Sequence, residues 1–223
     1  MIIAIDGPAG AGKSTIAKNI AQKLGFLYID TGAMYRALTL KALDTKVDIA
    51  DCDLLIELAR ASDIDLINDP DGSLRVLLDG KDVSQQIREP RITRHVSDVA
   101  KIRQVREVMV DLQRKFGRRG HSVLDGRDIG TVVFPHAEKK FFLDANFDER
   151  VRRRHKELID SGKNVSQESV KADISNRDTI DSTREVAPLK KADDAIYVDT
   201  TDLNIEQVTE LILSYLHGQI AHT

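Results

Sequence analysis

The stretch IIAIDGPAGAGKST, residues 2 to 15, decides the fold class of this chain. Its first five residues, IIAID, form an apolar run that is typical of a buried parallel strand. Residues 7 to 14 then match the pattern GxxxxGK[ST], in which glycines let successive backbone N–H groups face a phosphate at the start of a helix. Because a strand precedes the loop and a helix is expected from Lys13, the sequence predicts a P-loop in an α/β fold.

This loop predicts ATP as one ligand of the protein. Lys13 is expected to reach the β and γ phosphates, and Ser14 is expected to bind Mg²⁺. A GTPase is disfavoured because the chain has no NKxD-type sequence and because VLDG, residues 123 to 126, is followed by RDIG. A glycine-rich turn without a ligand is the alternative interpretation. The loop residues expected to contact ATP are Gly7, Pro8, Ala9, Gly10, Ala11, Gly12, Lys13, Ser14 and Thr15.

Short apolar runs alternate with amphipathic segments along most of the chain, as in parallel α/β sheets. Further strands are expected at FLYID, HSVLDG, KKFFLDA and AIYVDT, and helices at Lys13–Leu24, Thr31–Leu43, DLLIELARA and NIEQVTELILSYLHG. The segment from residue 63 to residue 84 departs from this rhythm, because two alternating runs flank the turn sequence NDPDG. The sequence therefore predicts a P-loop NTPase-type five-stranded parallel sheet flanked by helices, with a small antiparallel β insertion at 63–84 and a helical stretch at 84–116.

The composition excludes several classes of protein. The chain is 41% hydrophobic and 31% charged, with a formal net charge of −3, which argues against a broad basic surface for nucleic acid. It has one cysteine, Cys52, so no intrachain disulfide can form and a reducing compartment is expected. No apolar run approaches the roughly 20 residues that span a bilayer. We therefore expect a soluble cytoplasmic protein with no membrane or nucleic-acid partner.

Polar residues after the second strand indicate an acceptor site. Asp30 ends this strand, Thr31 is expected to cap the next helix, and Arg36 follows on its first turns. Ligands of α/β proteins bind at the carboxyl ends of the strands, where these side chains lie. The alternatives are a helix cap alone for Thr31 and a surface cation for Arg36.

The segments DGRDIGTVVFP, residues 125 to 135, and NRDTIDSTR, residues 176 to 184, carry further charged groups. Asp125 follows an apolar run and has the position of a Walker B-like carboxylate that orients Mg²⁺ through water. Arg127 and Asp128 lie between two glycines and are expected to form a presented site, with a solvated turn as the alternative. In the second segment Arg177, Asp181 and Arg184 share one helical face, where a simple ion-pair ladder is the alternative.

Three separate arginines, Arg36, Arg127 and Arg184, suit forked recognition of a dianionic phosphate. A phosphate monoester has a second pKa near 6, so at neutral pH its oxygens are nucleophilic without a strong general base. An alcohol acceptor needs such a base, and no Ser-His or Cys-His constellation is evident. We therefore expect transfer onto a phosphate, with Lys13 and these arginines as the catalytic residues.

Together the motifs GPAGAGKST, DTGAMYRA, SDVAKIRQVRE, DGRDIGTVVFP and RDTIDSTREVAPL resemble the bacterial cytidylate kinases, from Ile2 to about Leu213. The resemblance implies a nucleoside-monophosphate kinase fold with a short lid. It also implies Mg²⁺-dependent phosphorylation of CMP, and of dCMP, by ATP. The implied division is a core at 1–30, 119–148 and 182–223, an acceptor-binding region at 31–118 and a lid at 149–181. A monomer is expected.

The resemblance also implies roles for individual residues. Ser97, Arg106 and Asp128 fall where the family reads the cytosine base; a carboxylate can accept from the cytosine N4 amino group but faces a carbonyl in uracil. Thr31, Arg177 and Asp181 fall at the sugar, and Arg36, Arg127 and Arg184 at the acceptor phosphate. Arg150 and Arg154 are expected to cover ATP from the lid, with a solvated basic face as the alternative, and the loop Thr200–Leu203 is expected to pack on adenine.

Two other functions stay open on the residues alone. One is a kinase for another acceptor, such as UMP or a small phosphorylated metabolite. The other is a nucleotide-dependent switch or binding module that has no acceptor.

Overall fold

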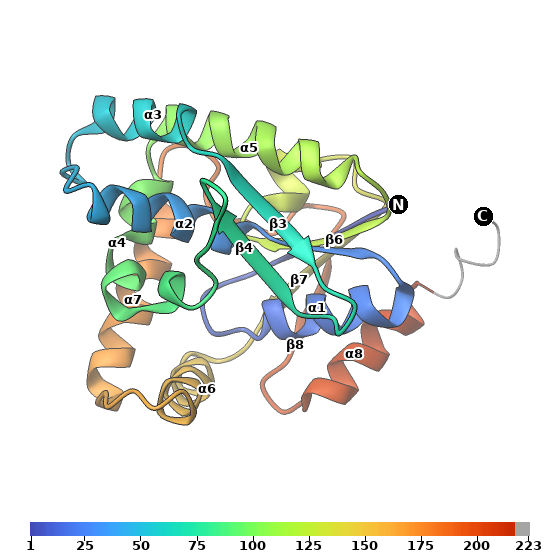
Figure 1. The fold of residues 1–223 in the computed structure, drawn as a ribbon. Coiled ribbons are helices and arrows are strands. Elements are labelled where there is room, and N and C mark those ends of the chain that lie inside the picture. The colour runs from blue at the N-terminus through green and yellow to red at the C-terminus, as the bar shows by residue number, and fades with distance from the viewer. Residues whose placement is uncertain (217–223) are drawn as a thin grey trace.

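The computed structural model describes residues 1–216 and has a five-stranded parallel sheet at its centre (Figure 1). The strand order is β2-β6-β1-β7-β8, and every neighbouring pair is parallel. This confirms the predicted sheet and each of its five strands. The strands are β1 (Ile2–Asp6), β2 (Leu27–Asp30), β6 (Ser122–Gly126), β7 (Lys139–Asp144) and β8 (Ile196–Asp199).

The central strand β1 delivers the phosphate loop to the carboxyl edge of the sheet. Ile3, Ala4 and Ile5 are fully buried because helices cover both faces of the sheet. On one face α1 (Lys13–Leu24) packs beside α8 (Ile205–Ser214), as Figure 1 shows. The predicted closing helix is confirmed over α8, and residues 217–218 of that prediction lie outside the described part of the chain.

The other face of the sheet is covered by helices from the middle of the chain. They are α2 (Thr31–Asp44), α3 (Cys52–Arg60), α4 (Pro90–Ala100) and α5 (Arg103–Gly117), with a short 3₁₀ turn η1 (Gln86–Arg88) before α4. The predicted cap at Thr31 is wrong. Asp30 caps α2 instead, since its side chain accepts a hydrogen bond from the Ala33 N–H at 2.8 Å, and the Thr31 hydroxyl donates to the Asp125 carbonyl at 2.7 Å.

The insertion predicted at 63–84 is a three-stranded antiparallel sheet. Its strands are β3 (Ile64–Asn68), β4 (Leu74–Leu78) and the two-residue β5 (Lys81–Asp82). Asn68 joins this small sheet to the edge strand β2: its side-chain amide accepts from the Tyr28 N–H at 2.9 Å and donates to the Tyr28 carbonyl at 3.1 Å. The amide thus satisfies an edge that is otherwise open to pairing.

Two helices after β7, α6 (Phe147–Asp160) and α7 (Gln167–Thr183), make up the predicted lid segment. A small apolar cluster of Ala9, Val151, Val170 and Ile174 packs them on the phosphate loop. The segment after Asp128 is a π-helical turn, η2 (Ile129–Val133), where the sequence indicated a loop. Among the helices of residues 1–216, none combines the length and the hydrophobicity that a membrane crossing requires.

Candidate active site

The phosphate loop is held tightly against its surroundings. Gly7 has a φ of 150°, and a Cβ there would lie 1.9 Å from the Leu143 carbonyl oxygen, so a larger residue cannot follow β1. At the end of the loop the Lys13 ammonium is buried and donates to the Pro8 carbonyl at 2.6 Å. Burial, and next the positive charge of Arg127, lower the pKa of Lys13 to about 7. An anionic phosphate bound beside Lys13 would therefore raise this pKa again and favour the charged form of the ammonium group.

Ser14 and Asp125, the expected magnesium residues, are in direct contact. The Ser14 hydroxyl donates to Asp125 Oδ2 at 2.7 Å, and the Tyr28 hydroxyl donates to Oδ1 at 2.9 Å. Burial, and next the charge of Asp30, raise the pKa of Asp125 to about 7. A hydroxyl and a carboxylate are oxygen ligands that suit Mg²⁺, which commonly takes one or two protein groups together with phosphate and water. Within residues 1–216 no group of three or more His, Cys, Asp or Glu side chains that could hold a metal ion is found.

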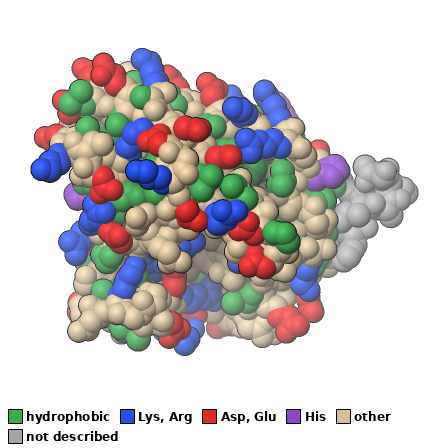
Figure 2. Space-filling view, viewed as in Figure 1, with side chains coloured by type: hydrophobic (Ala, Val, Ile, Leu, Met, Phe, Trp, Pro, Cys, Tyr) green, Lys and Arg blue, Asp and Glu red, His purple; other side chains and the backbone are tan. Residues whose placement is uncertain are grey.

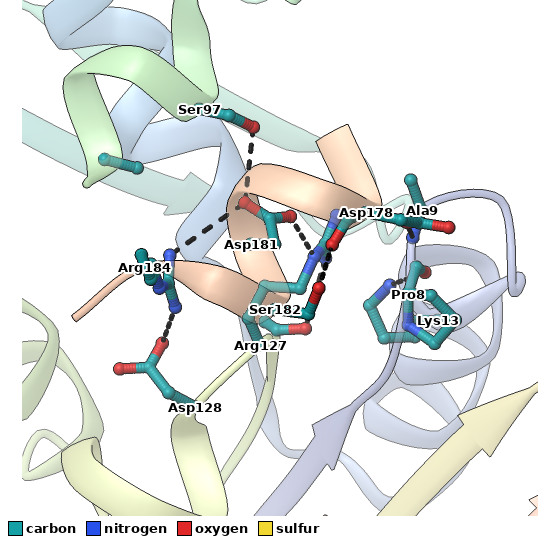
Figure 3. Close-up of polar contacts among 12 residues, drawn as sticks. Pro8, Ala9, Lys13, Ser97, Arg127, Asp128, Asp178, Asp181, Ser182 and Arg184 are labelled. Atoms are coloured by element: carbon teal, nitrogen blue, oxygen red, sulfur yellow. Dashed lines mark hydrogen bonds and ion pairs between the residues drawn. The ribbon is translucent and has the colours of Figure 1, made fainter. Parts of the chain in front are cut away.

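The residues expected to read the base lie in one buried cluster, of which Figure 3 shows Ser97 and Asp128 on either side of Asp181 and Arg184. Arg106 pairs with Asp128, and Arg184 reaches the other oxygen of Asp128 at 3.4 Å. All three side chains are at most 7% exposed. Ser97 donates to Asp181 at 3.2 Å, which brings it to the same cluster from α4. The structure therefore places Ser97, Arg106 and Asp128 together although they come from three separate segments.

Asp181 connects this cluster to the glycine-flanked arginine. Arg127 Nε donates to Asp181 Oδ2 at 2.8 Å, and Arg184 lies 4.0 Å from Asp181 Oδ1. The ion-pair ladder considered for α7 is therefore present between Asp181 and Arg184. It does not include Arg177, whose Nε is buried and has no hydrogen-bond partner within residues 1–216.

Arg177 and Arg36 lie close enough for their positive charges to repel each other. Arg36 donates to the Thr93 hydroxyl at 2.9 Å and to the Ile87 carbonyl at 3.3 Å. Burial, and next the charge of Arg177, lower the pKa of Arg36 to about 9, and burial followed by Arg127 lowers that of Arg177 to about 10. Positive groups that lower one another's pKa in this way favour the binding of an anionic ligand.

An open cleft lies between the phosphate loop and Arg177 of α7. Its walls include Ala9 and Gly10 of the loop, Thr93 of α4, and Arg154 and Arg177 of the lid segment. Arg154 forms a 2.7 Å ion pair with Glu157 and still lines the cleft. The cleft therefore lies between two residues of the predicted ATP-binding loop, Ala9 and Gly10, and one residue of the predicted acceptor site, Arg177.

Arg150 has a different environment from the solvated face that the sequence allowed. It is 8% exposed, donates to the Ala9 carbonyl at 2.9 Å and pairs with Asp178. Asp178 in turn accepts from the Ala9 N–H at 3.2 Å. Arg153 donates to the Thr200 hydroxyl at 2.9 Å and to the Thr200 carbonyl at 2.5 Å, joining α6 to the loop expected to pack on adenine.

Sequence reasoning missed Tyr28, Asp178 and Arg153. Tyr28 carried a signal, since it is the one hydroxyl-bearing residue in the apolar run FLYI ahead of Asp30. Asp178 and Arg153 lie beside residues that were identified, but nothing in their spacing showed which neighbour faces the phosphate loop.

On the surface of the molecule, acidic and basic side chains are interspersed over the face seen in Figure 2.

Comparisons with known proteins agree with this geometry. The sequence matches the family model "Cytidylate kinase" over residues 3–218. It is 53% identical over 210 residues to the cytidylate kinase of Caldanaerobacter subterraneus subsp. tengcongensis, covering 94% of this chain and 92% of that protein. It is 51% identical over 211 residues to that of Bacillus subtilis, covering 95% and 94%.

Among solved structures, an uncharacterized protein from Eubacterium ventriosum aligns with a TM-score of 0.51 at 14% identity, over 98% of this chain and 99% of that one. This likeness shows the fold alone. The family is decided by the sequence matches, which extend over nearly the whole length and include the phosphate loop, the Asp128 segment and α7. On these grounds the chain belongs to the cytidylate kinase family.

Proposed function

We propose that this protein transfers the γ-phosphoryl group of ATP to CMP, giving ADP and CDP, and that it accepts dCMP as a second substrate. The observation that carries the proposal is the proximity of a phosphate loop to a group of arginines. Arg177 lines the same cleft as Ala9 and Gly10 of the loop. Arg127 is linked through Asp181 and Arg184 to the buried Arg106–Asp128 pair. Membership of the cytidylate kinase family supports it.

The donor half of the reaction uses the phosphate loop. Lys13 neutralises charge on the β and γ phosphates of ATP, while Ser14 and Asp125 hold Mg²⁺ directly and through water. Bound in this way, Mg²⁺ supplies charge neutralisation on the phosphate oxygens. The Ser14–Asp125 contact of 2.7 Å supports a shared role, because each group fixes the orientation of the other.

The acceptor half uses arginines rather than a general base. Arg36, Arg127 and Arg184 hold the phosphate of CMP, whose oxygen attacks the transferring group. That phosphate is largely dianionic at neutral pH, so the protein needs to orient it and to screen its charge but not to remove a proton. The pKa of Arg36, which is lowered by burial and next by the charge of Arg177, supports this assignment, because a bound dianion would favour the charged form of the guanidinium.

Cytosine is read by Asp128, Arg106 and Ser97. The Asp128 carboxylate accepts a hydrogen bond from the N4 amino group, and Arg106 donates to the ring acceptors. Uracil turns a carbonyl oxygen toward Asp128, so two acceptors face each other and UMP binds more weakly. Thr31, Arg177 and Asp181 contact the sugar.

The division of the chain follows from these roles. The core at 1–30, 119–148 and 182–223 carries the phosphate loop, the region 31–118 binds the acceptor, and the lid at 149–181 closes over ATP with Arg150 and Arg154. Closure excludes water, which otherwise competes as phosphoryl acceptor. We propose that the protein works as a monomer in the cytoplasm.

A coupled assay of ADP formation tests the proposal. ATP and Mg²⁺ are combined with CMP, dCMP, UMP, AMP or GMP at equal concentrations. We expect turnover mainly with CMP and dCMP, and its loss when EDTA removes the metal. Equal use of UMP would contradict the base assignment, and slow hydrolysis that no monophosphate stimulates would leave a nucleotide-binding module.

A further inference from the structure

The backbone that carries Asp128 is a π-helical turn. The Val133 N–H donates to the Asp128 carbonyl at 3.1 Å, and the Phe134 N–H donates to the Ile129 carbonyl at 2.7 Å, each five residues back. Single π turns are rare and are frequently found at functional sites. Because Asp128 is the residue at the N-terminal boundary of this turn, the turn sets where its carboxylate lies.

A buried carboxylate from β1 holds the first end of the turn. Asp6 Oδ1 accepts from the Ile129 N–H and Oδ2 from the Gly130 N–H, both at 2.8 Å. The side chain is 4% exposed, so these two bonds replace its contacts with water. Gly130 permits the approach, since a Cβ there would lie 3.4 Å from Asp6 Oδ2 and 3.1 Å from the Lys140 side chain.

A guanidinium from α5 holds the other end. Arg114 Nη2 donates to the Val132 carbonyl and Nε donates to the Val133 carbonyl, both at 2.9 Å. The fork of the guanidinium thus satisfies two carbonyls that the turn itself leaves free. A negative charge at the N-terminal end and a positive charge at the C-terminal end also complement the dipole of the turn.

Asp6 and Arg114 contact the backbone of the turn, whereas the Asp128 side chain forms ion pairs. Arg106, on the same helix as Arg114, pairs with the Asp128 carboxylate, so α5 holds both the side chain and the turn from which it projects. The two oxygens of Asp6 are occupied by backbone N–H groups, and Arg114 contacts backbone carbonyls. Both residues therefore act on the base-reading carboxylate through the backbone.

We propose that Asp6 and Arg114 are positioning residues that clamp the π turn and thereby maintain selectivity for cytosine over uracil. The inference rests on the proposed function, because it requires Asp128 to read the base. A carboxylate discriminates an amino group from a carbonyl only while its place is fixed. A loosened turn lets Asp128 retreat from the uracil oxygen and lose its bond to the cytosine amino group, so the two affinities converge.

The test uses full-length Asp6→Asn and Arg114→Met variants. Lys115→Met is the control for Arg114→Met, since it makes the same charge change at an exposed position of the same helix. Asparagine can accept from one of the two N–H groups, but its own NH₂ group then faces the other. Calorimetry measures binding of CMP and of UMP to each protein, and hydrogen exchange measures protection of the amides at 129–134. We expect the ratio of CMP to UMP affinity to fall about tenfold in both clamp variants, with faster exchange in the turn, and no change in the control.

The outcomes separate the two proposals. A wild-type protein that binds CMP and UMP equally would overturn the base assignment itself. A selective wild-type protein whose variants keep the same affinity ratio would overturn the clamp alone, as would variants whose turn amides exchange no faster. ATP affinity of Arg114→Met should be unchanged, because the hydrogen bonds of this side chain go to the π turn and not to the phosphate loop. If that variant fails to fold, Arg114→Lys, which keeps the charge and removes the fork, is measured in the same way.

Discussion

Replacing Arg177 by methionine should stabilise the protein and weaken its use of CMP. The guanidinium has no ion pair within residues 1–216, and its Nε is buried without a hydrogen bond. Burial, and next the charge of Arg127, lower its pKa to about 10, well below the usual value for an arginine. Methionine keeps much of the apolar stem and removes the charge, so the charge no longer destabilises the folded state.

The size of the effect follows from the pKa. At about 1.4 kcal/mol per pKa unit, the lowering corresponds to about 3 kcal/mol. Because Arg177 is partly exposed, solvent screening reduces this figure, and we expect a gain of about 1 to 2 kcal/mol in the free energy of unfolding. For a chain of this length that raises Tm by roughly 4 °C. The folded-state pKa lies well above neutral, so both states stay protonated from pH 6 to pH 9 and the gain should be constant over that range.

Urea unfolding and scanning calorimetry in the absence of nucleotide provide the assay. Lys115→Met removes one positive charge from an exposed position and serves as the control, with no change expected. The same Arg177→Met protein should show a KM for CMP raised about tenfold, because a charge-assisted contact to the substrate is lost. An Arg177→Met protein that is less stable than the wild type, beside an unchanged control, would refute the reasoning that burial and the neighbouring cations outweigh the attraction of Asp178 and Asp181 at this arginine.

Three further predictions concern single residues of the site. Lys13→Ala should lower kcat by at least about 100-fold, since its charge acts on the transferring phosphoryl group; a coupled ADP assay that finds substantial activity would contradict the loop assignment. Asp128→Asn should reduce the ratio of kcat/KM for CMP to that for UMP by about 10- to 100-fold, and an unchanged ratio would remove Asp128 from base reading. Burial raises the pKa of Asp6 from 3.8 to about 6, so the folded state holds this proton more tightly. The contribution of Asp6 to the free energy of unfolding should therefore fall by about 3 kcal/mol as the pH rises through this interval, a slope that Asp6→Asn should lack in urea titrations.

The sheet could be predicted because its strands are nearly continuous apolar runs that end at polar residues. IIAID, HSVLDG and KKFFLDA each give a buried strand whose last residues reach the carboxyl edge, and the glycine pattern places the phosphate loop there. The cap of α2 could not be decided in the same way, because Asp30 and Thr31 are adjacent and both are good caps. Their roles depend on Asp125, which is distant in sequence and takes the Thr31 hydroxyl.

The π turn was also beyond sequence reasoning. The two charged residues that hold it, Asp6 and Arg114, lie 123 positions before Ile129 and 19 positions before Val133. Neither has a local pattern that points to the segment after Asp128. Contacts of this kind are set by which strands become neighbours, here β1 and β6, and so they appear only once the sheet is assembled.

Helix α7 contacts both the phosphate loop and Arg127 of the predicted acceptor site. Asp178 and Asp181 lie three residues apart on it: the first accepts from the Ala9 N–H of the phosphate loop, and the second accepts from Arg127. Each carboxylate therefore occupies a donor that the proposed function assigns to a phosphate. A buried cation without a counterion destabilises a fold, so these carboxylates stabilise the site when no phosphate is bound. They must release their hydrogen-bond donors when phosphates bind. Arg177 lies one position before Asp178 and has no carboxylate partner of this kind within residues 1–216. For that reason we expect its removal, rather than that of Arg127 or Arg150, to increase the stability of the fold.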